Sequence, residues 1–162
     1  MTKLLMVCMG NVCRSPMAQM VTSHMFEQAG MARQIQVDSA GTHASPRKGP
    51  ADSRVKTVLS GHGYAVGNGR SRHVTEQDFS RYDLILAMDR ENLNHLKRIC
   101  PSGHTHKLHL FLEFAQGTGI CDIPDPYYGS VEGFERVLDL CEAGARGLVD
   151  RLRNSHAECP QS

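Results

Sequence analysis

One short stretch of the chain combines a thiol and a guanidinium at a fixed spacing. Cys8 is separated by five residues from Arg14, and Ser15 follows directly. A thiolate is a strong nucleophile, and the planar guanidinium of arginine matches two oxygens of a phosphate group. The complete stretch, called the Cys8 loop below, consists of Cys8, Met9, Gly10, Asn11, Val12, Cys13, Arg14 and Ser15. These residue types predict a reactive cysteine beside a bound oxyanion.

The flanking residues predict that the Cys8 loop connects a strand to a helix. Residues 3–7 form an apolar run typical of a buried strand, and residues 17–28 are typical of a helix. The start of a helix presents unpaired N–H groups and the positive end of its dipole, so it attracts an anion. Gly10 and Asn11 best tolerate the unusual dihedral angles that curl these N–H groups around one point.

These surroundings predict the protonation state of Cys8. A free cysteine has a pKa of about 8.5, and N–H donors together with Arg14 favour the thiolate at neutral pH. Ser15 can donate its hydroxyl to that thiolate, and Pro16 suits the first turn of the helix. Alternatively, Cys8 is only a small buried side chain at the end of a core strand. The glycine, asparagine and arginine of the loop have no such packing reason and favour the reactive cysteine.

The composition indicates one ordinary globular domain. The chain has 162 residues, of which 40% are hydrophobic, and 18 basic residues balance 17 acidic ones. We expect a single domain over residues 1–162, with a loose tail from about residue 155. Because neither charge dominates, we expect no nucleic-acid or membrane partner.

The cysteines and the apolar runs predict a location in the cell. No leading segment resembles a signal peptide, and no apolar run reaches the length of a bilayer span. The six cysteines contain no pair spaced as in zinc sites, so we expect free thiols in the cytoplasm and no bound metal. The six are Cys8, Cys13, Cys100, Cys121, Cys141 and Cys159.

The alternation of apolar strands with helices predicts an α/β fold. We expect a three-layer sandwich in which helices cover both faces of a four-stranded parallel sheet. The predicted strands are residues 3–7, 34–37, 83–88 and 107–112, and the predicted helices are residues 17–28, 51–61, 90–99 and 131–153. The apolar stripe of the last helix is predicted to be Val131, Phe134, Val137, Leu138, Cys141, Leu148 and Leu152.

A second motif lies between the fourth strand and the last helix. Asp125 stands between two prolines, and proline restricts both its own dihedral angles and those of its neighbour. A carboxyl group held in this way can act as a general acid, although a Pro-Asp turn can also simply cap a helix. Asp122 is the competing carboxyl group, but it lacks the Asp-Pro-Tyr context. In an open α/β sheet this loop should reach the edge where the strands end, beside Cys8.

The two tyrosines that follow predict an aromatic pocket. Tyr127 and Tyr128, with the apolar Met9 and Val12, would form a slot for the ring of an aryl phosphate. The alternative is that both rings pack on the last helix.

Together these motifs resemble a known family of enzymes. Cys8, Arg14 and Ser15 at this spacing resemble the phosphate-binding loop of protein tyrosine phosphatases. With the Asp125-Pro126-Tyr127-Tyr128 sequence, the chain is similar to the low-molecular-weight family over nearly its whole length. This resemblance implies a flavodoxin-like architecture and hydrolysis of phosphotyrosine through a phosphocysteine, with no cofactor. It further implies that Cys8 is the nucleophile, that Arg14 binds the phosphate and that Asp125 is the general acid.

The resemblance also implies supporting roles. Ser39 and Asp89 would hold the residues of the Cys8 loop in place without contacting the substrate. The alternative for Asp89 is that it only caps the helix that follows it. Cys13 would form a reversible disulfide with Cys8, or it would be only a packed side chain. Val12 is apolar where relatives that act on phosphoarginine carry threonine, which favours phosphotyrosine. The expected partners are phosphotyrosine-containing proteins, including a bacterial tyrosine kinase.

Other features were weighed against this interpretation. Many relatives carry a bulky aromatic residue shortly after the Ser39 to Thr42 stretch, whereas this chain has residues 43–48, which are partly basic, and no tryptophan. The pocket wall is therefore predicted to be lower and more basic. Arsenate reductase shares the fold but needs a resolving pair of cysteines, for which Cys100, Cys121 and Cys159 lack the spacing. A silent phosphate-binding module would need neither Asp125 nor Ser15.

Two polar clusters are not assigned to a site. His104, His106 and His109 would not converge on a metal, because on a strand the first two face one side and the third faces the other. Arg70, Arg72 and His73 are interpreted as a solvated surface.

Overall fold

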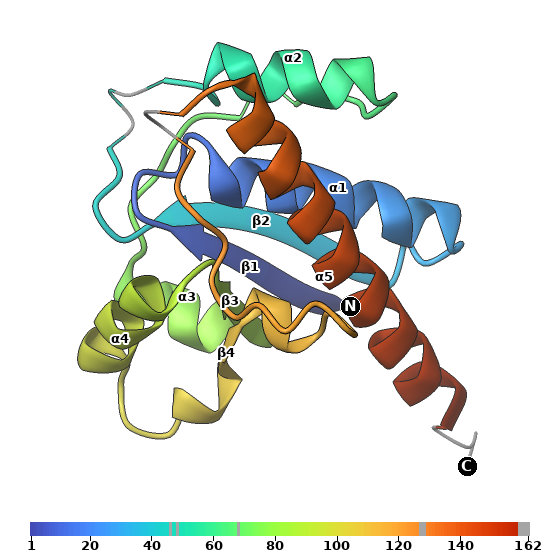
Figure 1. The fold of residues 1–162 in the computed structure, drawn as a ribbon. Coiled ribbons are helices and arrows are strands. Elements are labelled where there is room, and N and C mark those ends of the chain that lie inside the picture. Colours follow the sequence, from blue (N-terminus) through green and yellow to red (C-terminus); the bar gives the residue numbers. More distant parts are fainter. Residues whose placement is uncertain (46, 48, 68, 127–128, 159–162) are drawn as a thin grey trace.

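A four-stranded parallel sheet forms the centre of the computed structural model (Figure 1). The structure describes residues 1–45, 47, 49–67, 69–126 and 129–158. The strands are β1 (Thr2–Cys8), β2 (Ile35–Gly41), β3 (Leu84–Ala87) and β4 (Leu108–Leu110), in the spatial order β2-β1-β3-β4. Every pairing is parallel, which confirms the predicted α/β class.

Helices cover both faces of this sheet. One face carries α1 (Arg14–Gln28), α2 (Ser53–Gly61) and α5 (Val131–Glu158), and the other carries α3 (Glu76–Arg81) and α4 (Arg90–Ile99) (Figure 1). Strand β1 contributes side chains to the core on each face of the sheet, because successive side chains of a strand point to opposite faces. Leu4 and Met6 join the core under α1 and α5, whereas Leu5 and Val7 join the core under α3 and α4. This explains why β1 is a continuous apolar run.

The register of the strands brings their carboxyl ends to one edge. Cys8 at the end of β1 lies beside Gly41 at the end of β2, and Val7 lies beside Ala87 at the end of β3. The Cys8 loop, the segment after β2 and the start of α4 therefore meet at this edge, as expected for an open α/β sheet.

Several boundaries differ from the predicted ones. Helix α1 begins at Arg14 rather than residue 17, and β2 continues to Gly41 rather than ending at residue 37. Helix α3 was not predicted; it is a six-residue helix in which Asp78 accepts a hydrogen bond from the backbone N–H of Thr75 (2.8 Å). The fourth strand is shorter than residues 107–112, because short 3-10 helices replace its ends. These helices are η2 (Thr105–Lys107) and η3 (Phe111–Glu113).

The 3-10 helix η2 also corrects the argument about the histidines. His104 and His106 were placed on one face of a strand, but His106 lies within η2 and His104 directly precedes it. The two residues therefore do not follow the two-residue alternation of a strand.

Helix α5 confirms most of its predicted apolar stripe. Phe134, Val137, Leu138, Cys141 and Leu148 are buried, and Leu152 is half-buried. Val131 was wrongly included, since it is 67% exposed at the first residue of the helix. The helix continues to Glu158, beyond the predicted end at residue 153, so residues 155–158 are helical where a loose tail was expected.

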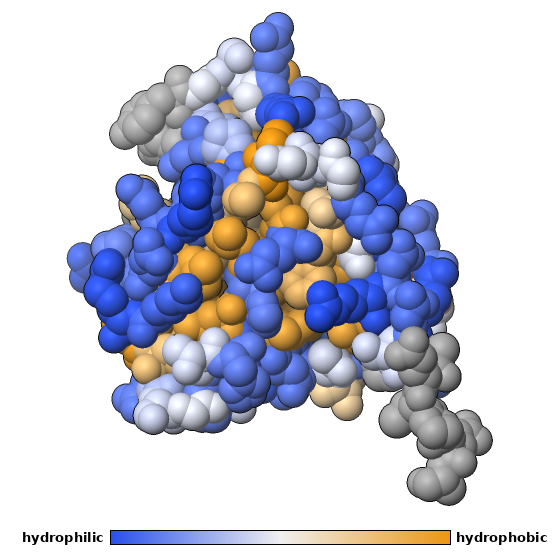
Figure 2. Space-filling model, turned by 60° about the horizontal axis from the view of Figure 1, so that its bottom comes forward, coloured by the Kyte–Doolittle hydropathy of each residue, from blue (hydrophilic) through white to orange (hydrophobic). Residues whose placement is uncertain are grey.

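Apolar and hydrophilic residues occupy different parts of the face shown in Figure 2. In the view of Figure 2, apolar residues gather toward the middle of the face, and hydrophilic residues surround them. The large hydrophobic side chains that are most exposed are Met1, Met9, Ile99 and Val131. Within the described ranges, no helix combines the length and the apolar character needed to cross a membrane.

The packing of α5 against the chain after β4 predicts the effect of one substitution. A Cβ atom on Gly147 would lie 1.6 Å from the carbonyl oxygen of Phe114, so backbone must move to admit it. We expect Gly147→Ala to lower the free energy of unfolding by about 1–3 kcal/mol, measured by urea denaturation. Gly133→Ala in the same helix is the control, because its Cβ would meet only ordinary contacts at 3.8 Å. It should be neutral or stabilising, by up to about 1 kcal/mol. Equal losses in both variants would contradict this account.

Candidate active site

Asn11 holds the Cys8 loop in an unusual conformation. Its φ angle is 55°, in the left-handed region that asparagine tolerates better than most residues. Its side-chain Nδ2 donates to Ser15 Oγ (2.8 Å) and Ser39 Oγ (2.9 Å). Its Oδ1 accepts from the backbone N–H of Arg72 (3.0 Å), and its carbonyl accepts from Ser71 Oγ (2.9 Å). The conformation is therefore held by residues of β2, α1 and the segment before α3.

The sulfur of Cys8 lies at the centre of this loop. The residue is 3% exposed, and its Sγ accepts the backbone N–H of Asn11 at 3.3 Å. Ser15 Oγ lies 3.0 Å from the same sulfur. A hydroxyl and a backbone N–H are donors that a thiolate can use, so the loop offers a preformed environment for an anionic sulfur.

The end of β2 packs closely behind the loop. Thr42 donates its backbone N–H to the carbonyl of Cys8 (2.9 Å), and His43 donates to that of Met9 (2.9 Å). A Cβ atom on Gly41 would lie 2.6 Å from the Met9 carbonyl oxygen, so only glycine fits there without a shift. Sequence reasoning noted the Ser39 to Thr42 stretch but missed this requirement. A glycine at the end of a predicted strand is the signal that could have indicated it.

Arg14 is a buried cation in the first turn of α1. Its side chain is 5% exposed, and Nη1 donates to Asp89 Oδ2 (2.5 Å) and to the carbonyl of Ile123 (3.0 Å). Burial opposes the charge, but the bond and the charge of Asp89 outweigh it and raise the pKa of Arg14 above its ordinary value. Asp89 also accepts the backbone N–H of Asn92 (2.8 Å), so it caps α4 as well.

Asp125 and Asp122 have different partners. Asp125 Oδ2 lies 3.8 Å from Arg14 Nη2, and its side chain is 44% exposed. Asp122 accepts three hydrogen bonds from Arg90, from its backbone N–H (2.9 Å), Nε (3.1 Å) and Nη2 (3.0 Å). Burial raises the pKa of Asp122, but these bonds outweigh it and hold the pKa below its usual range. Asp122 is therefore ionised and committed to Arg90, whereas Asp125 stands beside Arg14.

Main-chain bonds fix the loop that carries both acids, residues 121–126, called the Asp125 loop below. Ile123 donates its backbone N–H to the carbonyl of Met88 (2.9 Å), and its own carbonyl accepts from Arg14. Ile123 is fully buried, which secures the loop at the carboxyl end of β3. Sequence reasoning missed this contact, because a backbone carbonyl leaves no side-chain pattern.

Cys13 is buried behind the loop. Its exposed fraction is 4%, and burial, followed by the nearby charges of Asp52 and Cys8, raises its pKa to about 12. The Cys13 thiol is therefore protonated at neutral pH. Asp52 lies close because it caps α2, accepting the N–H of Arg54 (2.8 Å), and donates its own N–H to the Val12 carbonyl (2.8 Å).

The interpretation of Arg72 as part of a solvated surface was wrong. Arg72 is half-buried, and its guanidinium bonds both oxygens of the buried Asp78, at 2.9 Å and 3.1 Å. Arg70 and His73, grouped with it, are exposed. The predicted pocket residues Tyr127 and Tyr128 lie outside the described residues, as do Pro46 and Lys48 of the predicted pocket wall.

The arrangement is suited to attack on a tetrahedral anion. A cysteine sulfur, a charged guanidinium and a partly exposed carboxyl group meet at one sheet edge, on two segments that are far apart in the sequence, the Cys8 loop and the Asp125 loop. The part of the chain that the structure describes contains no group of three histidine, cysteine, aspartate or glutamate residues able to hold a metal ion.

Comparison with known proteins places this site in context. The family model of the low molecular weight phosphotyrosine protein phosphatases matches residues 3–158. A low molecular weight protein-tyrosine-phosphatase of Streptomyces coelicolor is 39% identical over 150 residues, covering 91% of each chain. A protein tyrosine phosphatase from Entamoeba histolytica superposes with a TM-score of 0.91 at 37% identity, over 96% of this chain and 99% of that one. A low molecular weight phosphotyrosine phosphatase from Vibrio cholerae superposes with a TM-score of 0.90 at 41% identity, over 96% and 99%.

The environment of Cys13 predicts its reactivity. Because its pKa is about 12, the thiolate needed for alkylation is scarce at pH 8, and burial restricts access further. We expect iodoacetamide at pH 8 to leave Cys13 unmodified in the folded protein, as measured by peptide mass spectrometry. Exposed Cys121 is the internal control and should be modified. Modification of Cys13 at a rate matching Cys121 would show that the thiol is neither buried nor protonated as described.

Proposed function

The chain belongs to the low molecular weight phosphotyrosine protein phosphatase family, and we propose that it hydrolyses phosphotyrosine in proteins through a phosphocysteine formed on Cys8. The observation that carries this proposal is the convergence of three groups. The Cys8 sulfur lies in a loop of N–H donors, Arg14 is buried in the next turn, and Asp125 lies 3.8 Å from Arg14.

In the first step the Cys8 thiolate attacks phosphorus in line with the bond to the phenolic oxygen. A sulfur–phosphorus bond forms, and the phosphorus–oxygen bond to tyrosine breaks. Arg14 and the N–H groups of the Cys8 loop stabilise the negative charge on the three equatorial oxygens. Asp89 and Ile123 hold the guanidinium by Nη1, so its orientation is set before substrate arrives.

Asp125 supplies the proton that the departing phenolate needs. Its side chain is 44% exposed, so both solvent and a bound substrate can reach it. In the second step the ionised Asp125 takes a proton from water, whose oxygen attacks phosphorus and releases Cys8 and inorganic phosphate. Asp122 is unsuited to be the acid of the first step, because its bonds to Arg90 lower its pKa and favour the carboxylate, which has no proton to donate.

The aromatic substrate class is supported by the apolar loop residues. On the Cys8 loop, Met9 is exposed and Val12 is half-buried, so both side chains can contact a phenyl ring. The predicted contribution of Tyr127 and Tyr128 to the same slot stays part of this proposal.

Arsenate reduction with Cys100 as the resolving cysteine is disfavoured by the position of Cys100. Cys100 follows the last residue of α4, and α4 begins beside the site at Arg90. Ten residues of helix span about 15 Å, which is too far for a disulfide with Cys8.

We propose a reducing compartment, the cytoplasm, for this chemistry, and phosphotyrosine-containing proteins, including a tyrosine kinase, as substrates. The free thiols of Cys8, Cys13, Cys100, Cys121 and Cys141 support this location.

The role of Cys8 predicts a complete loss of turnover in one variant. Serine retains the size of the side chain but is a far weaker nucleophile at neutral pH. We expect the wild-type protein to hydrolyse para-nitrophenyl phosphate in EDTA, and Cys8→Ser to be inactive, measured as release of nitrophenolate. Cys100→Ser is the matched control and should retain activity, because Cys100 follows the end of α4 that is far from the site.

The same assay with competing substrates tests the substrate class. Phosphotyrosine should inhibit hydrolysis of the chromogenic substrate more strongly than phosphoarginine does. Stronger inhibition by phosphoarginine would indicate phosphoarginine as the substrate class. A wild-type protein that is inactive when reduced would refute the phosphatase proposal.

The two carboxyl groups of the Asp125 loop predict different mutant kinetics. Asp125→Asn should lower kcat by about 10²–10⁴-fold for phenyl phosphates with poor leaving groups, because the departing oxygen then lacks a proton donor. Substrates with good leaving groups should lose less. Asp122→Asn, the matched control, removes only the anchor to Arg90 and should show no such dependence on the leaving group. Leaving-group dependence in Asp122→Asn alone would assign the acid to Asp122.

A further inference from the structure

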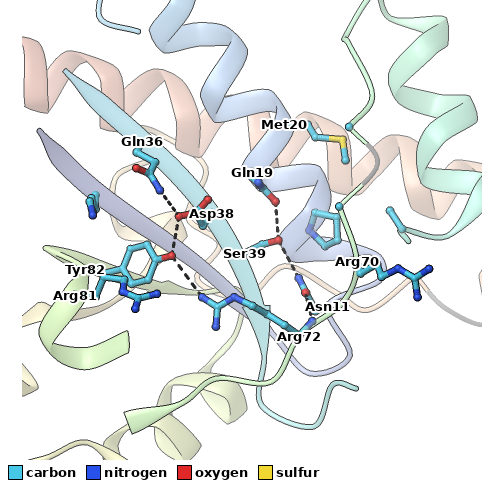
Figure 3. Close-up of a pocket in the computed structure, with 15 residues that line it drawn as sticks. Asn11, Gln19, Met20, Gln36, Asp38, Ser39, Arg70, Arg72, Arg81 and Tyr82 are labelled. Atoms are coloured by element: carbon cyan, nitrogen blue, oxygen red, sulfur yellow. Dashed lines mark hydrogen bonds between the residues drawn. The ribbon is translucent and has the colours of Figure 1, made fainter. Parts of the chain in front are cut away.

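A cavity of about 680 Å³ lies along β2 (Figure 3). Asn11 and Ser39, which also hold the Cys8 loop, line part of it. Figure 3 shows Gln36, Asp38 and Tyr82 on one side of the strand and Gln19 and Met20 on the other. The cavity therefore extends over both sides of β2, which is an outer strand of the sheet. A cavity at the open edge of a sheet differs from a ligand pocket buried between elements, because backbone groups form part of its wall.

The pairing of β2 shows which backbone groups face this cavity. Gly41 donates its N–H to Arg72 (2.9 Å) and accepts from Val74 (3.0 Å), so its backbone bonds point away from β1. In a parallel sheet alternate residues bond to the same side, and therefore Val37 and Ser39 also direct their N–H and C=O groups to this edge. Gln19 Nε2 reaches the Val37 carbonyl at 3.3 Å. Among the described residues, the segment before α3 forms a bridge to β2 at Gly41 alone. Before Gly41, Ser39 lines the cavity, whereas the Val37 carbonyl is already occupied by Gln19.

The charge of the cavity wall is positive. The basic residues that line it are Lys3, Arg70, Arg72 and Arg81, and the acidic one is Asp38. Asp38 accepts hydrogen bonds from the hydroxyl of Tyr82 (2.7 Å) and from Gln36 (2.8 Å), and Arg72 is paired with Asp78. Arg70 and Arg81 are exposed and remain available to an anionic partner.

We propose that the open edge of β2 binds an extended acidic segment of a partner protein as an additional strand. The N–H and C=O groups of Ser39 and the N–H of Val37 would pair with the backbone of that segment. Acidic side chains on one face of the segment would meet Lys3 and Arg81. Alternate side chains would point to the opposite face, where apolar surface of Pro16, Met20 and Ala51 lines the cavity.

The spread of the charges favours a peptide over a small anion. The two exposed arginines, Arg81 and Arg70, lie at opposite ends of the cavity in Figure 3, so one small anion would not contact both. A strand rises by about 3.3 Å per residue, and a short peptide can therefore span the row. This binding uses no group that reacts with substrate in the proposed mechanism, and it goes beyond the proposed phosphatase activity.

The test uses a fluorescein-labelled octapeptide of alternating glutamate and valine. We expect it to bind the full-length protein, as measured by fluorescence anisotropy, and to shift and protect the amide signals of Val37 and Ser39 in NMR spectra with hydrogen exchange. A second peptide of the same sequence, N-methylated on alternate residues, retains the charge but loses the N–H donors that pair with β2. It should not bind.

Two variants with the same change of charge test the basic wall. Arg81→Met should weaken binding of the octapeptide about threefold, as expected for an exposed ion pair. Arg153→Met, at an exposed residue of α5 outside the cavity, should bind as the wild type does. Equal affinity for the N-methylated peptide, or unchanged Val37 and Ser39 amides, would overturn the proposal. Displacement of the peptide by an equal concentration of inorganic pyrophosphate would also overturn it and would assign the cavity to small anions.

Discussion

The left-handed conformation of Asn11 is the constraint on which the candidate active site depends. At a φ of 55°, the backbone turns so that the N–H of Asn11 points at the Cys8 sulfur. Such a conformation costs about 1–3 kcal/mol and persists only where the surroundings determine it. Here Ser15, Ser39 and Arg72 bond every polar atom of the Asn11 side chain. The loop is therefore shaped by its own protein contacts before any phosphate arrives.

Arg14 connects the Cys8 loop to the start of α4 and to the Asp125 loop. Its guanidinium contacts Asp89 at the start of α4, and Ile123 and Asp125 on the Asp125 loop. A buried charge stripped of its partner is strongly destabilising, so each of these segments has an energetic reason to remain in place. The buried ion pair thereby serves both structure and chemistry, since the cation that would bind phosphate also aligns the carboxyl group that would donate the proton.

The parallel sheet, the long helices and the convergence of the Cys8 loop with Asp125 could be predicted from sequence, because apolar runs and motif spacing are local signals. Helix α3 escaped prediction, since six residues carry too little periodicity. Arg72 was misjudged because its partner Asp78 is recruited by that unseen helix. Gly41 and the Ile123 carbonyl were missed because their importance arises from contacts with backbone distant in sequence, which no side-chain pattern records. The pocket residues Tyr127 and Tyr128 lie outside the described residues and stay predictions.

The way in which Ile123 is held has a consequence for sequence variation. Both of its polar contacts, with Met88 and Arg14, are made by its main chain, so they do not depend on which apolar side chain occupies the position. The buried side chain needs only to fill its space. Another aliphatic residue at position 123 can therefore replace Ile123 and still leave Asp125 in the same place. The position of the Asp125 loop therefore depends on main-chain bonds that most substitutions of this side chain leave intact.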